Sequence, residues 1–360
     1  MVHILLATII IVALIGQDKD KLITRFAFFL LFLFAALRYM YGSDYNAYLL
    51  KYGTIQSGQT DVFGDEMLFT LLNVISPSFQ WVVVVTSFAF VIVVYYLITR
   101  NLPRNYVWVG LLIFIINPQL FLVNLSAMRQ CLAMLLFIAA IPFAHRRKPI
   151  PYILLLLVAS LFHKSSLMLI PFYLFISPRP VKAGKIIAVL AVMFVGLYLV
   201  DMVGLAQYAA TFFEDTQYMH YASNELTNSL RATLLTSVYF IFVLFNLPRL
   251  KGRLLVYGKL YLISTMLGVL AFRLSMLTRI QMYFDIFSVV VIPAILIELR
   301  KEGKVKVDPS RPLASVWGCI NHYALPILIF VIYGLRYYSF FTNPMWSRYF
   351  SEYRTIFEVL

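Results

Sequence analysis

Two short stretches of the chain hold side chains that could take up a proton beside polar neighbours. His163 and Lys164 stand in LFHKSS, between two apolar runs, and Asp44 stands in ALRYMYGSDYNAY, where Gly42 suits a tight turn. An imidazole can accept or relay a proton near neutral pH, whereas an exposed carboxylate stays ionised. We predict His163 and Asp44 as catalytic residues, with His163 the preferred proton acceptor. The alternatives are that His163 only caps a turn, or that Asp44 is the base.

Arginines and tyrosines recur near the ends of the apolar segments. A guanidinium group can bind a phosphate through two parallel hydrogen bonds, which an ammonium group cannot do. Arginines at such positions can also extend toward lipid headgroups, and this is the alternative for each of them taken singly. We predict that the group binds an anionic substrate. The candidate substrate-binding residues are Arg38, Arg129, Arg273, Arg279, Tyr283, Tyr353 and Arg354.

The composition indicates which elements must position these side chains. Hydrophobic residues make up 62% of the 360 residues and charged residues 13%, which excludes a soluble globule and a disordered chain. Runs such as WVVVVTSFAFVIVVYYLI do not alternate apolar and polar residues, so helices are favoured over a β-barrel. We therefore predict an all-α fold, a polytopic helical bundle in a membrane.

The apolar runs predict about twelve membrane segments in one transmembrane domain over residues 1–360. The run 149–177 has basic residues at both ends, so we expect it to reverse as a short helical hairpin around residue 163. Outer loops are expected at about 38–79 and 204–230, and an outer C-terminal tail at about 340–360. The predicted segments are 1–16, 22–37, 80–99, 106–123, 127–144, 149–163, 165–178, 185–203, 231–247, 255–273, 279–298 and 319–339.

Charge sets the orientation. The net charge is +14, and most of the 30 basic residues fall in short loops such as HRRK and RPVKAGK, which are expected in the cytoplasm. The positive charge is thus explained by cytoplasmic loops of a membrane protein, and no nucleic-acid partner is predicted. Both termini are then outside. The basic residues left on the outer side are mostly arginines, which favours an anionic substrate that faces outward.

Six motifs, in order, carry a resemblance to a known family. They are LRYMYGSDYNAY, DEMLFTLLN at residues 65–73, NLSAMRQCLA followed by HRRK, LFHKSSLMLIPFY, RLSMLTRIQMYF and a final YRTIF. In these motifs the chain resembles the EpsG/Wzy-type polysaccharide polymerases of bacterial envelopes, over residues from about 36 to 357. No role is assigned to the acidic residues of DEMLFTLLN.

The resemblance implies a reaction and a place for it. Such polymerases join undecaprenyl-diphosphate-linked oligosaccharide repeat units into O-antigen, capsule or exopolysaccharide, at the outer face of the bacterial inner membrane. They are similar to lipid-dependent glycosyltransferases of the GT-C type. The arginines would then hold the diphosphate, and His163 or Asp44 would serve the acceptor hydroxyl. No metal or other cofactor is expected, because the diphosphate is already a competent leaving group. A chain-length regulator and a flippase are the expected protein partners.

Two other classes of protein remain open at this stage. An integral-membrane acyltransferase that modifies a surface glycan would also use a histidine within membrane helices. A flippase or transporter of lipid-linked glycans would need charged paths from both faces, and the sequence has no inverted repeat. The chain also lacks P-loop, GxGxxG, HExxH, CxxC and GxSxG motifs, and Cys131 and Cys319 predict neither a disulfide nor a metal site.

Overall fold

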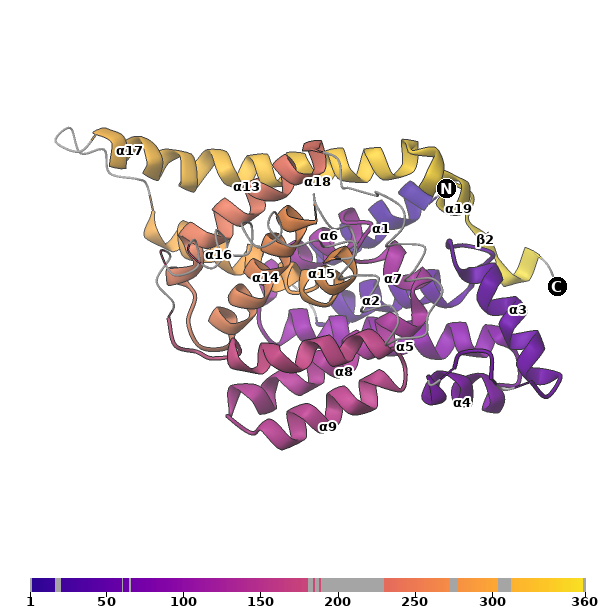
Figure 1. Ribbon diagram of the computed structural model, residues 1–360. Coiled ribbons are helices and arrows are strands. Elements are labelled where there is room, and N and C mark those ends of the chain that lie inside the picture. The colour runs from indigo at the N-terminus through magenta and orange to yellow at the C-terminus, as the bar shows by residue number, and fades with distance from the viewer. Residues whose placement is uncertain are drawn as a thin grey trace. The chain divides into compact units, whose positions relative to one another are not determined.

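The computed structural model is built almost entirely of helices, as the composition predicts (Figure 1). It describes residues 2–16, 21–59, 61–64, 66–180, 184, 188, 230–271, 277–303 and 312–358. The predicted membrane segment 185–203, the predicted outer loop 204–230 and Arg273 therefore lie outside the described residues, apart from single positions. The chain is an all-α membrane protein, and the only sheet among the described residues has two short strands.

The chain divides into two compact units, each discontinuous in sequence. The first contains residues 1–177, 288–294 and 330–360, and the second contains 178–287 and 295–329. This division by contacts does not test whether residues 1–360 form one transmembrane domain, which stays a prediction.

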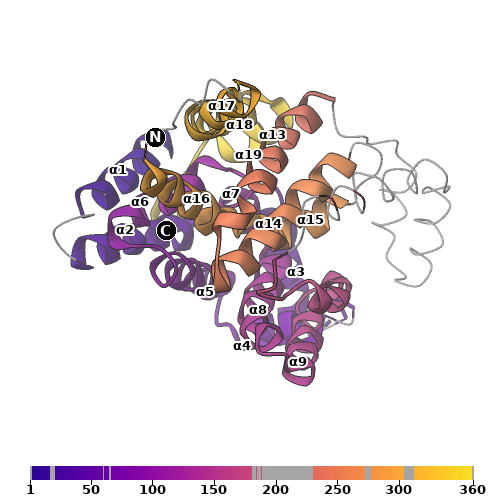
Figure 2. The same cartoon turned by 90° about the vertical axis from the view of Figure 1, so that its left-hand side faces the viewer.

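The first unit holds the N-terminal helices and the C-terminal segment. Within it, α8 and α9 pack side by side, as both views show (Figures 1 and 2), and α2 packs against α5. Its elements are α1 (Val2–Ile15), α2 (Lys21–Ala36), β1 (Arg38–Tyr39), α3 (Tyr45–Gln56), α4 (Met67–Ile75), α5 (Phe79–Thr99), η1 (Arg104–Tyr106), α6 (Val107–Ile116), α7 (Leu122–Ser126), α8 (Met128–His145), α9 (Pro149–Ser160), the 3₁₀ helix η2 (Lys164–Leu174), α19 (Pro344–Phe350), β2 (Arg354–Thr355) and η5 (Ile356–Glu358).

The second unit is built around α14, which packs against α13 and α15. Inside it, Asn246 and Asn321 exchange hydrogen bonds of 2.7 and 3.1 Å between their buried side-chain amides. Helices α16 and α18 contribute residues to both units. The elements are α13 (Leu230–Asn246), η3 (Leu247–Arg249), α14 (Gly252–Leu270), α15 (Leu277–Asp285), α16 (Ser288–Glu302), α17 (Pro312–Cys319), the π-helical turn η4 (Ile320–Ala324) and α18 (Leu325–Thr342).

The structure corrects the predicted number of membrane segments. Within the described residues, five helical stretches are long and apolar enough to cross a membrane: Phe79–Thr99, Met128–His145, Leu230–Arg249, Gly252–Leu270 and Ser315–Thr342. Helices α15 and α16 meet at a bend of 54° and add a sixth if the pair crosses as one span. The prediction of about twelve segments is therefore wrong for this part of the chain, whereas the prediction of a multi-pass helical protein is confirmed.

The difference arises because several apolar runs form helices that are too short. Helices α1, α6 and α9 contain 14, 10 and 12 residues, or roughly 15–21 Å at 1.5 Å per residue, against a hydrocarbon core of about 30 Å. Helix α6 ends at Ile116 because Pro118 disfavours the helical conformation in the residue before it, and Asn117 is accordingly extended. Hydrophobicity therefore overcounted the spans, since it does not register where a helix ends.

The first and last of the six motifs, LRYMYGSDYNAY and YRTIF, lie side by side in the first unit. Strands β1 and β2 pair antiparallel, with Arg38 opposite Thr355 and Tyr39 opposite Arg354. Next to them the Tyr353 hydroxyl donates a 2.7 Å hydrogen bond to the carbonyl of Phe34, and the two rings stack with centroids 4.5 Å apart. The C-terminal segment is thus fastened to the end of α2.

Candidate functional site

The segment around His163 forms the expected reversal. Helix α9 and the 3₁₀ helix η2 are its two arms, and His163 lies in the turn between them with extended backbone angles. Two side-chain hydrogen bonds join the arms, from the Tyr152 hydroxyl to the Leu169 carbonyl at 2.7 Å and from the Ser166 hydroxyl to the Leu156 carbonyl at 3.3 Å. His163 is therefore held at the tip of a braced hairpin.

A carboxylate from a distant part of the chain meets this tip. Glu66 immediately precedes α4, and one of its oxygens, Oε1, lies 2.7 Å from His163 Nδ1. The same oxygen accepts the Lys164 backbone N–H at 3.3 Å, while the Leu68 N–H donates to the Leu161 carbonyl at 3.0 Å. The start of α4 is thereby docked on the hairpin.

The other oxygen of Glu66, Oε2, accepts a hydrogen bond from an arginine. Arg129, in the first turn of α8, donates from Nη1 to Glu66 Oε2 at 2.5 Å and from Nε to the Tyr48 hydroxyl at 3.2 Å. Its guanidinium also lies 5.3 Å from the centroid of the Phe63 ring. We call Glu66, Arg129 and His163, with Tyr48, the Glu66 cluster. It joins α3, α4, α8 and the hairpin tip.

Burial and charge together set the state of the carboxylate. The Glu66 side chain is 7% exposed. Burial alone would raise the pKa of Glu66, but the hydrogen bond to His163 and the charge of Arg129 outweigh it and bring the pKa below its ordinary value. Glu66 is therefore ionised at neutral pH. Burial raises the pKa of the Tyr48 phenol, which keeps its proton.

An ionised Glu66 decides which nitrogen of His163 can accept a proton. A carboxylate can only accept hydrogen bonds, so Nδ1 carries the hydrogen that it donates to Glu66, and in the neutral ring Nε2 has the free lone pair. That Nε2 is buried and has no hydrogen-bond partner among the described residues. A histidine oriented by a carboxylate, with its second nitrogen unpaired, has the arrangement of a general base.

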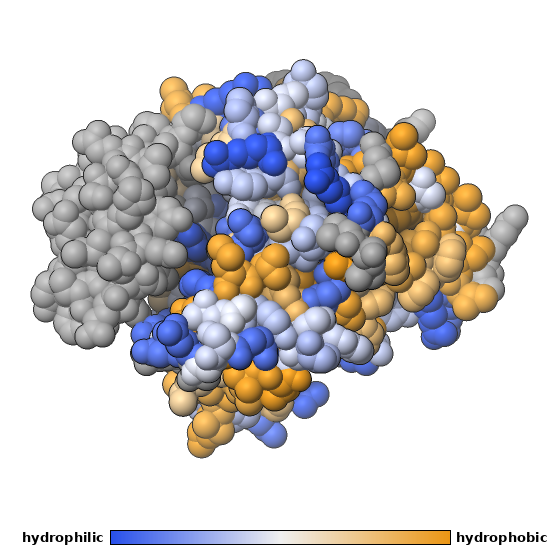
Figure 3. Space-filling model, turned by 90° about the vertical axis from the view of Figure 1, so that its right-hand side faces the viewer, coloured by the Kyte–Doolittle hydropathy of each residue, from blue (hydrophilic) through white to orange (hydrophobic). Residues whose placement is uncertain are grey.

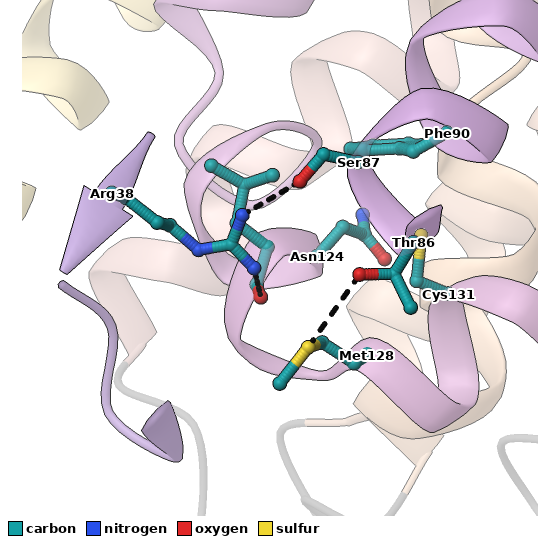
Figure 4. A pocket seen from close by; sticks show the side chains of 8 residues that line it. Arg38, Thr86, Ser87, Phe90, Asn124, Met128 and Cys131 are labelled. Carbon is teal, nitrogen blue, oxygen red and sulfur yellow. Dashed lines mark hydrogen bonds between the residues drawn. The ribbon is translucent and has the colours of Figure 1, made fainter. Parts of the chain in front are cut away.

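Arg38 lies in surroundings of a different kind (Figure 4). It is 1% exposed and donates to three neutral oxygens: the Ala35 carbonyl, the Ser87 hydroxyl at 2.8 Å and the Leu125 carbonyl at 2.9 Å. Burial lowers its pKa to about 10, so it stays charged at neutral pH. Arg38 ties the end of α2 to α5 and α7. The small pocket beside it is lined by Arg38, Thr86, Ser87, Phe90, Asn124, Leu125, Met128 and Cys131.

The remaining predicted site residues are distributed over both units. Asp44 is exposed at the start of α3, where the Ser43 hydroxyl donates to it at 2.9 Å. Arg354 is also exposed and pairs with Glu352 at 2.9 Å. Arg279 and the buried Tyr283 lie on α15, in the second unit. The structure thus brings Arg129 and His163 together, and Arg38 and Tyr353 to neighbouring positions.

Glu66 is the residue that sequence reasoning missed. It stands in DEMLFTLLN, a motif that supports the family resemblance without suggesting a role for its carboxylates. One signal was available: the residue directly precedes a run, residues 67–99, that contains no charged residue. A carboxylate at the edge of so apolar a run needs a partner. Nothing local in the sequence names Arg129 and His163 as the partners.

The fold and the site define a multi-pass helical membrane protein in which a buried carboxylate is paired with a histidine and a partly exposed arginine. A model of the EpsG family matches residues 21–342, so the chain belongs to the EpsG family, and the resemblance read from its motifs is confirmed. Membership indicates a general role as a glycosyltransferase-like polysaccharide polymerase. No curated protein and no solved structure matches the chain.

Proposed function

We propose that this protein polymerises undecaprenyl-diphosphate-linked oligosaccharide repeat units into a bacterial surface polysaccharide. The reaction would take place at the outer face of the inner membrane, as the charge pattern of the loops favours. The single observation that carries the proposal is the Glu66–His163 hydrogen bond of 2.7 Å, with His163 Nε2 left unpaired and Arg129 on the same carboxylate.

His163 is the proposed proton acceptor. As the acceptor hydroxyl attacks the anomeric carbon of the growing chain, its oxygen forms the new C–O bond and its proton passes to Nε2. The ionised Glu66 stabilises the imidazolium that results, because it faces Nδ1. The bond from the anomeric carbon to the diphosphate breaks at the same time, and the lipid diphosphate departs as an anion. His163 then returns its proton to solvent or to the departing phosphate.

Arg129 is the proposed ligand of the diphosphate. Its Nη1 and Nε are taken up by Glu66 and Tyr48, whereas Nη2 has no partner among the described residues. The side chain is 21% exposed, so an anion can reach it. A guanidinium held from behind by a carboxylate cannot rotate freely, which prepares it for charge that develops on the leaving group.

The other predicted residues keep supporting roles in the proposal. Arg273, Arg279, Tyr283, Tyr353 and Arg354 remain candidates for contacts with the sugars or the diphosphate. Asp44 remains a candidate for orienting a sugar. For Arg38 we propose a structural role, because three neutral oxygens already accept its hydrogen bonds.

The test is polymerisation by the purified protein in liposomes supplied with lipid-diphosphate repeat units. We expect a ladder of glycan lengths from the wild-type chain and a loss of roughly 10²–10⁴ in rate for His163→Gln, which cannot take the proton. Acyl transfer, or movement of the substrate without chemistry, would point instead to an acyltransferase or a flippase.

A matched control is His3→Gln. His3 is also a hydrogen-bonded histidine of the first unit, but its Nδ1 lies 2.7 Å from the Tyr337 hydroxyl instead of a carboxylate. It should polymerise at the wild-type rate. A His163→Gln variant that is fully active beside an inactive Asp44→Asn variant would move the base to Asp44.

A further inference from the structure

Helix α4 belongs to an uncharged stretch that is too long for one membrane crossing. No Asp, Glu, Lys or Arg occurs from Met67 to Thr99. A span needs about 20 residues, and α5 alone contains 21 residues. Helix α4 and the short link after it are thus an apolar addition to a complete span, within a segment predicted as an outer loop.

The exposed face of α4 is apolar. Met67, Leu71, Val74 and Ile75 have exposed fractions of 66%, 51%, 47% and 68%. Their spacing places them along one side of the helix. The opposite side carries Phe69 and Asn73, both fully buried. Four large apolar side chains on one exposed face of a nine-residue helix are costly in water.

Several backbone carbonyls at the end of α4 are paired within the protein, whereas the buried side-chain oxygen Oδ1 of Asn73 has no partner among the described residues. The Asn73 amide donates to the Phe69 carbonyl at 2.7 Å, and the Ser76 hydroxyl donates to the Leu72 carbonyl at 2.6 Å. From α3, Gln56 donates to the Asn73 carbonyl at 3.0 Å, and Tyr52 donates to the Ser76 carbonyl at 2.8 Å. A helix end is tolerated in an apolar medium when its last carbonyls have such partners.

The membrane helix that follows α4 also exposes large apolar side chains. After the link Ser76–Ser78, helix α5 exposes Trp81, Val85 and Phe88, at 54%, 40% and 56%. Tryptophan concentrates where the hydrocarbon of a bilayer meets its headgroups. Figure 3 shows the side of the molecule on which α3 and α4 are drawn in Figure 1, and apolar side chains lie open at its surface.

We propose that α4 is an interfacial helix whose face of Met67, Leu71, Val74 and Ile75 is covered by the acyl chains of the bilayer. Glu66 directly precedes α4, so the Glu66 cluster lies at the level where headgroups meet hydrocarbon. For a lipid-linked substrate, a consequence that rests on the proposed function, the diphosphate would meet Arg129 without leaving the membrane surface.

The test is the environment of α4 in the full chain in lipid bilayers, with no need for activity. A spin label is attached to Leu71→Cys, in a chain with Cys131→Ala and Cys319→Ala. The control label is at Gln59→Cys, an exposed polar position of the same predicted loop. We expect the ratio of accessibility to oxygen over accessibility to a water-soluble nickel chelate to be several-fold higher at 71 than at 59.

Two outcomes would overturn the proposal. Equal ratios at the two positions would place the α4 face in water, and a label at 71 shielded from both reagents would indicate a protein partner such as a second copy. If the cysteine-free chain does not fold, a photo-crosslinking amino acid at position 71 of the native chain decides the matter. It should capture phospholipid, and capture of protein or of nothing contradicts the proposal. Because no outcome depends on catalysis, failure here leaves the polymerase proposal to its own assay.

Discussion

Two arginines that the sequence suggests for the same task lie in opposite surroundings. Arg38 is fully enclosed, and its hydrogen bonds go to two backbone carbonyls and a serine. Arg129 is partly exposed, is paired with a carboxylate, and keeps Nη2 unpaired among the described residues. Side-chain type alone does not make an arginine a ligand. What matters is whether an unpaired donor can be reached, because the unpaired Nε of Arg38 is buried whereas the Arg129 side chain is partly exposed.

The largest effect on activity should come from replacing Glu66, the carboxylate that pairs with Arg129 and has no counterpart beside Arg38. Glu66→Gln keeps the shape of Glu66 but removes its charge, so the His163 imidazolium loses the anion that stabilises it. The new amide can also donate hydrogen bonds, so it no longer fixes the hydrogen of His163 on Nδ1. We expect polymerisation to fall by roughly 10²–10⁴ in the liposome assay. Polymerisation at the wild-type rate would remove Glu66 from the mechanism.

Arg129→Lys sharpens the comparison from the functional side. Lysine keeps the charge that faces Glu66 but cannot serve Glu66, Tyr48 and a phosphate in one plane. We expect a loss of roughly 10- to 100-fold in rate, about 1.4–2.8 kcal/mol, with thermal stability nearly unchanged. The matched control is Arg249→Lys, since Arg249 also pairs with a glutamate, Glu302, at 2.7 Å but in the second unit. A control that loses as much activity would count against a specific role for Arg129.

Arg38→Ala tests the structural side. The substitution leaves the Ala35 and Leu125 carbonyls and the Ser87 hydroxyl without their donor, and each unsatisfied buried group costs about 1–3 kcal/mol. We expect a clearly lower thermal midpoint in detergent and less protein in the membrane. The activity of the protein that still folds should fall less than in Arg129→Lys. The reverse ranking would return Arg38 to the diphosphate site.

The smallest effect should be on the pH dependence of stability. The folded state lowers the pKa of Glu66 below its ordinary value of 4.5, so the contribution of Glu66 is complete above that pH and is lost as the pH falls through the lower, folded value. The stability advantage of the wild type over Glu66→Gln should therefore not shrink from pH 7 to about pH 5, and it should be lost only in stronger acid. A difference that already shrinks near pH 6 would mean that Glu66 is not held ionised by its partners.

Local pattern predicted a substantial part of this structure. The uncharged apolar runs predicted helices, and the pair of basic flanks around residues 149–177 predicted a reversal at His163. Both depend on neighbours in the sequence, which composition and charge report directly. The count of membrane segments failed for a related reason, because helix length also depends on breakers such as Pro118 and on the 3₁₀ geometry of η2.

By itself, the sequence determined the helical membrane class, the family, and the residue types available for chemistry, because these follow from composition, charge and motif order along the chain. Only the tertiary structure decided which of those residues work together. Glu66 meets His163 across 97 positions and Arg129 across 63, and Arg38 is enclosed by helices that no spacing rule connects to it. A buried charge is stabilised by whatever the fold places within about 3 Å of it, and that partner is selected by packing instead of by sequence distance.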